Sequence, residues 1–136
     1  MNLQIVFSRC PEGVPEDEFN AWYDEHLAEI LSIPGFMSAQ RYRLDPVVVD
    51  PDWPSSYGFL AVYETGDDTE ALMAEMEKAN LTTKDSYTRR KDEDASGPAL
   101  PDWWDRVRFA SWNCISLGGR VEMHGTHEVT SWDERT

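Results

Sequence analysis

The residue of this sequence best suited to chemistry is His26, which lies within an apolar and aromatic segment. The residues at the spacing of one helix face are Phe19, Trp22, Tyr23 and Ile30, and His26 falls on the same face. A histidine on such a face is shielded from water, and burial disfavours the charged imidazole. A neutral imidazole accepts a proton from a carbon acid or a phenol near pH 7. The pattern therefore predicts a general base.

Tyr23 is the expected partner of this base. It precedes His26 by three residues, so the two side chains are neighbours on a helix. Its phenol is able to hydrogen-bond the imidazole or to polarise a substrate oxygen. In the alternative interpretation, His26 donates an N–H to a backbone carbonyl or a sheet side chain and fills the core. The sequence leaves both interpretations open.

Several other side chains are candidates for binding a substrate. Trp22 and Phe19 are either pocket walls or core residues, because aromatic side chains bury area with or without a ligand. Arg41 and Arg43 share a predicted strand, and each is suited either to clamp a carboxylate or to pair with a surface acid. The polar strand residues are Gln40, Tyr42, Ser111 and Asn113. Which sheet face these occupy is open, because a register shift of one residue moves every side chain to the other face.

Hydrophobic periodicity predicts a single domain of residues 1–136 with the element order βαββαβ. Strands are predicted at 3–7, 36–44, 57–63 and 106–117, and helices at 15–33 and from 66–69 to Asn80. Residues 82–105 are polar and without periodicity, which indicates an irregular insertion. The C-terminal segment, about 120–136, is expected to form an arm or a short extra strand.

This order corresponds to the ferredoxin-like split βαβ arrangement, an α+β fold in which a four-stranded antiparallel sheet carries two helices on one face. The other face then exposes apolar residues, for which Val6, Ala39, Leu60 and Val62 are the candidates. A second copy of the sheet is the simplest cover for them. We therefore predict a homodimer in which the two sheets face each other.

The motif FNAWYDEHL at 19–27, followed by IPGF at 33–36 and AQRY at 39–42, resembles the first helix and second strand of EthD-like proteins of the dimeric α+β-barrel superfamily. The similarity covers about residues 1–65, and later elements agree in order and spacing. It implies a barrel made by two protomers, with a pocket between each sheet and its helices. In related barrels such pockets hold small aromatic or lactone substrates of cyclases, dehydratases, isomerases and cofactor-free monooxygenases.

The composition argues against polyanionic partners. The 136 residues include 26 Asp and Glu against 12 Lys and Arg, a net charge of −14, and there is no basic stripe for nucleic acid or for anionic membranes. Residues 11–34 hold seven acids and no Lys or Arg, which predicts a solvated, negative outer helix face. This acidity favours a neutral or phenolic substrate over a multiply charged acid, unless Arg41 or Arg43 reaches the pocket. Residues 84–94, with four acids and four bases, are interpreted as a solvated run.

No membrane, metal or cofactor is expected. No apolar run reaches the ~18 residues of a membrane span, and the first residues do not resemble a signal peptide, so a cytoplasmic protein is predicted. Cys10 and Cys114 are expected to be free thiols. His124 and His127, with two nearby glutamates, fall short of the converging ligands of a zinc site. Glycine-rich nucleotide motifs are absent.

The leading hypothesis is a small enzyme doing cofactor-free acid–base chemistry on a small aromatic, polyketide-like or lactone metabolite of a catabolic or secondary-metabolic pathway. Dehydration, cyclisation and isomerisation all fit, with His26 as base and Tyr23 as its partner. One alternative is a cofactor-free or haem-dependent monooxygenase, as in sister barrels. Another is a non-catalytic protein that binds a hydrophobic metabolite or supports a partner enzyme.

Overall fold

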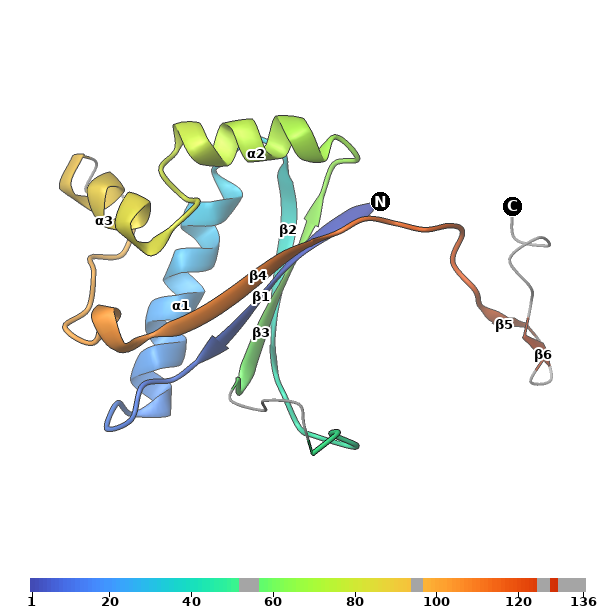
Figure 1. Cartoon of the computed structure of the whole chain (residues 1–136), viewed down its shortest axis with the longest axis horizontal. Coiled ribbons are helices and arrows are strands. Elements are labelled where there is room, and N and C mark those ends of the chain that lie inside the picture. The colour runs from blue at the N-terminus through green and yellow to red at the C-terminus, as the bar shows by residue number, and fades with distance from the viewer. Residues whose placement is uncertain (52–56, 94–96, 125–127, 130–136) are drawn as a thin grey trace.

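The structure is a computed structural model that describes residues 1–51, 57–93, 97–124 and 128–129. Its centre is a four-stranded antiparallel sheet of order β2-β3-β1-β4 (Figure 1). The strands are β1 (Asn2–Arg9), β2 (Phe36–Arg43), β3 (Phe59–Thr65) and β4 (Arg108–Cys114). The predicted α+β, ferredoxin-like sheet is thus confirmed.

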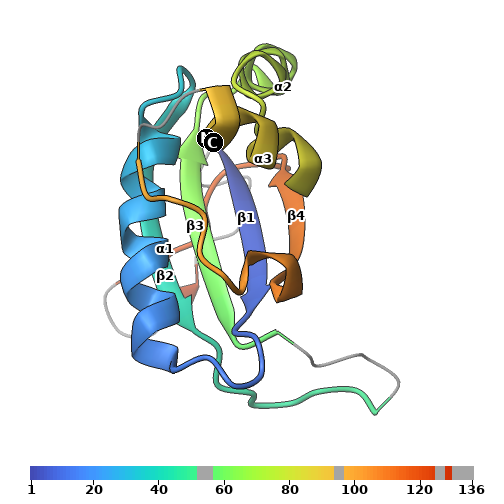
Figure 2. The same ribbon diagram turned by 90° about the vertical axis from the view of Figure 1, so that its left-hand side faces the viewer.

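The helices of the described part are α1 (Glu16–Leu31), α2 (Thr69–Lys78) and α3 (Lys84–Glu93), with a 3-10 turn η1 (Trp104–Arg106). Figure 2 shows α1, α3 and η1 in front of one face of the sheet, with α2 across its end. None of the helices in the described residues is long and apolar enough to cross a membrane. The sequence predicts two helices, so α3 is a correction to the irregular insertion expected at 82–105.

A reciprocal cap starts α3. The Thr83 hydroxyl accepts a hydrogen bond from the Ser86 backbone N–H at 3.0 Å, and the Ser86 hydroxyl accepts from the Thr83 N–H at 2.9 Å. The two hydrogen bonds form a capping box in which Ser86 replaces the usual Glu or Gln. Because Ser86 and Tyr87 are the buried residues of α3, the helix has no apolar stripe for periodicity to detect.

Helix α1 begins one residue after the start and ends two residues before the end of the predicted range 15–33. Pro15 occupies its N-cap rather than its first helical position, and three acids in the first turn interact favourably with the helix dipole. After the C-cap at Ser32, Gly35 adopts a φ of +104° that disfavours other residues. A Cβ at Gly35 would lie 2.9 Å from Leu72 Cδ1, so this turn also needs glycine for the close approach of α2.

Strand register decides which side chains face the helices. Val6 pairs with Ala61, and Ala39 pairs with Tyr63; both Val6 and Ala39 pack against the core beneath the helices. Placing these two on the uncovered face was therefore wrong, whereas Leu60 and Val62 do lie there. A β-bulge between Phe36 and Ser38 breaks the alternation of β2. Phe36 is buried as a result, while Gln40 and Tyr42 are exposed on the opposite face.

The sheet face away from the helices carries apolar and aromatic residues. The Phe7 ring lies 5.7 Å from Trp112 and 6.0 Å from Tyr57, between ring centroids. Trp112 is 55% exposed. Beyond β4 the chain leaves the sheet (Figure 1) and reaches two short strands that pair with each other, β5 (Met123–His124) and β6 (Glu128–Val129). Cys10 and Cys114 are free thiols.

Candidate functional site

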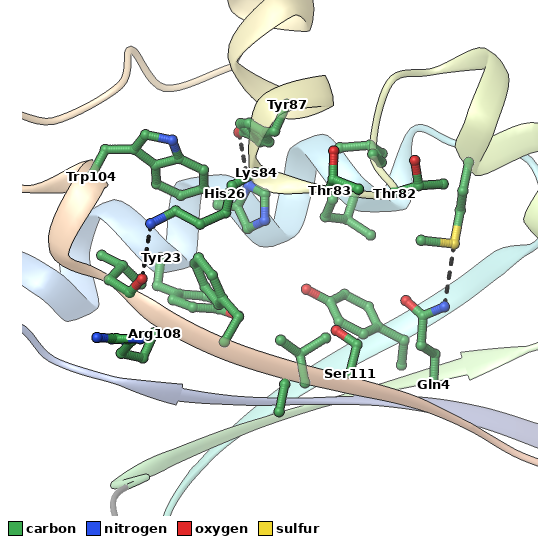
Figure 3. A pocket seen from close by; sticks show the side chains of 18 of the residues that line it. Gln4, Tyr23, His26, Thr82, Thr83, Lys84, Tyr87, Trp104, Arg108 and Ser111 are labelled. Atoms are coloured by element: carbon green, nitrogen blue, oxygen red, sulfur yellow. Dashed lines mark hydrogen bonds between the residues drawn. The ribbon is translucent and has the colours of Figure 1, made fainter.

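A cavity of about 900 Å³ lies between the helix-facing side of the sheet, α1, α3 and η1 (Figure 3). This volume falls within the roughly 300–1,000 Å³ of small-molecule sites. Its apolar walls include Val6, Ile30, Met76, Trp104 and Phe109. The polar lining includes Gln4, Thr83, Lys84 and Ser111. Both predicted chemical residues, His26 and Tyr23, line this cavity.

His26 is held between aromatic rings. Trp22 stacks on the imidazole, with centroids 5.0 Å apart and planes 11° apart, and the Trp22 indole N–H donates to the Ala99 carbonyl at 2.9 Å. Tyr87 of α3 lies on another side, 5.1 Å away between centroids. The His26 side chain is 12% exposed. The imidazole therefore has little rotational freedom.

Hydrogen bonding sets the tautomer of His26. Its Nδ1 lies 2.9 Å from the Tyr87 hydroxyl, and that hydroxyl donates to Glu29 Oε1. A phenol has one proton to donate, so toward Nδ1 its oxygen acts as acceptor, and Nδ1 carries the proton. The other nitrogen, Nε2, has no hydrogen-bond partner within the described residues. A neutral His26 therefore carries its basic lone pair on Nε2.

Glu29 is the buried anchor of this arrangement. Its side chain is 2% exposed, and its Oε2 accepts from Lys91 Nζ at 2.7 Å and from Arg90 Nε at 3.0 Å. Burial alone raises the pKa of Glu29, but hydrogen bonds from His26, Lys91, Tyr87 and Arg90 together bring it well below the ordinary value of 4.5. Glu29 is therefore a carboxylate near neutral pH. The prediction of a solvated run at 84–94 and a wholly solvated outer face of α1 was wrong here, because α3 folds back onto Glu29.

The pKa of His26 is lowered from its ordinary 6.5. Burial is the largest cause, and Lys91 and Arg90 lower it further, whereas Glu29 opposes the shift. The imidazole is accordingly neutral near pH 7. It meets the protonation requirement of a general base.

Tyr23 lies beside His26 without being its hydrogen-bond partner. The two rings meet edge to face, 5.5 Å apart between centroids, and Tyr87 takes the role that the sequence assigned to Tyr23. Burial raises the pKa of Tyr23 to about 12, although Arg41 and Ser8 lower it. The phenol stays protonated, so it is a hydrogen-bond donor at the cavity wall.

Of the other candidates, Ser111 lines the cavity, whereas the remaining predicted site residues do not. Phe19 is fully buried in the core, and Trp22 lies behind His26. The Arg41 guanidinium lies 4.2 Å from the Tyr23 ring centroid and donates to Asn20 at 2.8 Å. Asn113 accepts from Gln4 at 3.0 Å. The residues outside the lining are Phe19, Trp22, Gln40, Arg41, Tyr42, Arg43 and Asn113.

Sequence reasoning missed Glu29, Tyr87 and the cations around the cavity. Glu29 stands three residues after His26, a spacing that places it beside the histidine on a helix. The Thr83 to Ser86 cap is the signal for α3. Lys84 Nζ donates to the backbone carbonyls of Asp105 at 3.2 Å and Val107 at 3.0 Å, contacts that no local pattern indicates.

The sequence matches no family model and no curated protein. Among solved structures, HapK from Hahella chejuensis is similar over 91% of this chain and 100% of its own, with a TM-score of 0.50 and 15% identity. The two chains share a fold. An ethyl tert-butyl ether D (EthD) family protein from Bacillus halodurans also matches, over 82% of this chain and 96% of its own, with a TM-score of 0.43 and 19% identity. An EthD family protein is thus among the solved structures similar to this chain, as the sequence resemblance predicts. At these identities the matches concern the fold alone.

Within the described residues, no group of three or more His, Cys, Asp and Glu side chains is arranged to hold a metal ion. His127 lies outside the described residues, and the side chain of His124 is not described. The expectation of no zinc site in the C-terminal segment therefore stays a prediction.

We predict that Tyr87→Phe destabilises the protein, and that His26 of the wild type carries its proton on Nδ1. The change removes the hydroxyl that donates to Glu29 and accepts from Nδ1, which should lower the free energy of unfolding by about 1–3 kcal/mol. Urea unfolding measures this loss, and ¹⁵N NMR of the histidines reports the tautomer. Tyr42→Phe, on the exposed sheet face, is the control and should change neither. A wild-type His26 that carries its proton on Nε2 rather than on Nδ1 would contradict the assignment.

Proposed function

We propose that the protein is a small enzyme that abstracts a proton from a small substrate without a cofactor, with Nε2 of His26 as the base. The observation that carries the proposal is the series of hydrogen bonds from Glu29 through Tyr87 to Nδ1 of His26. It leaves Nε2 as the basic atom of a neutral imidazole that lines the cavity, with no hydrogen-bond partner within the described residues. A general base requires this protonation state and this access.

The same hydrogen bonds stabilise the imidazolium that proton transfer produces. When Nε2 takes a proton from a substrate carbon, the C–H electron pair moves into the substrate and an adjacent carbonyl becomes an enolate. The imidazolium that forms keeps its Nδ1–H on Tyr87, close to the negative Glu29. Tyr23 and Tyr63 line the cavity as protonated phenols, since burial raises the pKa of both, and they are suited to donate to the enolate oxygen.

The fate of the enolate decides the class of reaction. Return of the proton to another carbon is an isomerisation, loss of a β-hydroxyl group as water is a dehydration, and attack of the enolate on a second carbonyl is a cyclisation. All three begin with the step assigned to His26. A small aromatic or polyketide-like metabolite agrees with the aromatic lining that Tyr23, Tyr63, Trp104 and Phe109 provide.

The probe 5-nitrobenzisoxazole tests proton abstraction without knowledge of the natural substrate. Its C3 proton goes to a base while its N–O bond breaks, and the product is a coloured cyanonitrophenolate. We expect the protein to accelerate this elimination over buffer, with a rate that reaches half of its plateau at a pH below 6.5, because the pKa of His26 is lowered from that value. A rate equal to that of free imidazole would overturn the proposal. A Soret band, or oxygen uptake with a quinol, would instead favour the monooxygenase alternative.

We also propose that two copies of the chain pack their open sheet faces together. The support is the row of apolar and aromatic side chains there, with Trp112 at 55% and Tyr42 at 45% exposure. Buried against a second copy, such a face is stabilised by the hydrophobic effect.

Light scattering is expected to give twice the 15.6 kDa mass of one chain. Trp112→Glu should shift the protein toward the monomer, because it places a charge in the apolar face. Val47→Glu, at a residue 95% exposed and outside the sheet, is the matched control and should leave the mass unchanged. A wild-type monomer at micromolar concentration would show that this face has another role.

A further inference from the structure

Cations gather at one end of the cavity in this strongly acidic protein. Eleven of the twelve Lys and Arg residues lie in the described part of the chain, and six of them form ion pairs with acids. Four of the other five are Arg9, Lys84, Arg106 and Arg108. The fifth, Arg89, is exposed on α3. The cations that lack an ion-pair partner within the described residues are therefore concentrated at one place.

Two cavities meet at these cations. Arg106 and Arg108 line both the large cavity, with Lys84 and His26, and a second hollow of about 250 Å³, with Arg9. Figure 3 shows Lys84 and Arg108 at the same end of the large cavity, beside Trp104. Arg9 and Arg108 are directly paired in the β1–β4 register. Like charges opposite each other in a sheet are destabilising, so the fold holds these charges together at a cost in stability.

Neighbouring acids do not neutralise the cluster. Burial is the main cause of the lowered pKa of Lys84, and Arg108 lowers it further, whereas Asp105 and Asp85 oppose the shift. The amine of Lys84 is held by two backbone carbonyls, and Arg106 donates to the Glu12 backbone carbonyl at 2.7 Å rather than to its carboxylate. Neutral carbonyls orient these two side chains. Neither forms an ion pair within the described residues, although Asp105 lines the large cavity and Glu12 lines the second hollow.

We propose that this cluster is the subsite for an anionic group, so that the cavity takes an aromatic or otherwise apolar compound bearing a carboxylate or a phosphate. This names the substrate class of the proposed site and in that sense rests on the proposed function. It replaces the neutral substrate predicted from the overall charge, because Arg106, Arg108 and Lys84 supply the cations that Arg41 and Arg43 do not bring to the cavity. Guanidinium groups bind carboxylates and phosphates through paired, charge-assisted hydrogen bonds.

Direct binding tests the subsite without catalysis. Calorimetry compares 1-naphthoate with 1-naphthamide, which has the same rings and a similar size but no charge, and 1-naphthyl phosphate serves as the phosphate arm. We expect at least one anion to bind the wild-type protein roughly tenfold more tightly than the amide. Arg108→Gln should abolish that preference while leaving amide affinity unchanged. The control Arg89→Gln removes an equal charge outside the cavity and should keep the preference.

The anion that binds more tightly, 1-naphthoate or 1-naphthyl phosphate, shows whether the subsite prefers a carboxylate or a phosphate. Equal affinity for anions and amide, or failure of both anions to bind at millimolar concentration, overturns the subsite. An Arg89→Gln effect as large as that of Arg108→Gln also overturns it, because the preference would then come from the overall charge. His26→Gln separates the two proposals: it should keep the anion preference even if His26 proves to have no catalytic role.

Discussion

Replacing His26 with Gln is expected to lower the rate of 5-nitrobenzisoxazole elimination at least about 100-fold, the lower end of what a positioned general base contributes. Gln has an amide N–H that is able to donate to Tyr87 as Nδ1 does. It has no basic nitrogen, so it preserves the packing and removes the chemistry. His26→Ala should lose the same activity and, in addition, some stability, because it leaves Trp22 without the ring on which it stacks.

The pH dependence of the elimination rate is a second test of His26 as the base. In the wild-type protein the rate should fall as the imidazole gains a proton, with its half-maximal point below pH 6.5, since the folded pKa of His26 lies below its ordinary 6.5. In His26→Gln that inflection should disappear together with the rate. Glu25→Gln, an exposed change one residue away, is the control and should behave as wild type. If His26→Gln keeps both rate and inflection, the cavity is a binding site and His26 a core residue.

The largest expected effect on stability is that of Glu29→Gln, about 3–5 kcal/mol. The change leaves Arg90 and Lys91, whose side chains are 13% and 7% exposed, without the carboxylate that both contact. Urea unfolding at neutral pH measures the loss, with Glu25→Gln as the exposed control expected within about 0.5 kcal/mol of wild type. Since small domains are stable by roughly 5–15 kcal/mol, Glu29→Gln should remove a large part of the total.

A double-mutant cycle assigns the loss to the buried charges. Glu29→Gln combined with Lys91→Met removes both members of one contact, so the double variant should lose less stability than the sum of the two single changes. Additive losses would mean that α3 is held by other contacts and that Glu29 is not its anchor.

Acid sensitivity follows from the same group with a defined sign. The pKa of Glu29 is lowered in the folded state, so its contribution is complete above the ordinary value of 4.5 and is lost as the pH falls below that value. His26 also has a lowered pKa, so below pH 6.5 the unfolded chain binds more protons and stability begins to decline. The decline of stability below pH 4.5 should be shallower in Glu29→Gln than in wild type.

The sequence alone determined the four strands of the sheet, the helices α1 and α2, and one chemical residue. The helix stripe through His26, the Pro15 start, the Gly35 turn and the alternation of β1 all arise from neighbours within a few residues. Local spacing is enough to fix such features, and it also placed Tyr23 and His26 on the face of α1 that meets the cavity.

Only the tertiary structure decided the partners of His26. Tyr87 lies 61 residues from it, on a helix whose buried residues are Ser86 and Tyr87. Among the seven acids around α1, Glu29 is marked only by its spacing of three residues from His26, and that spacing does not show that it is buried. Likewise the β2 bulge, which moved Gln40 and Tyr42 away from the helices, and the meeting of Lys84 with Arg108 depend on how distant segments pack. Burial and charge compensation are properties of that packing, so the base was visible in the sequence whereas the groups that orient it and the cations that share its cavity were not.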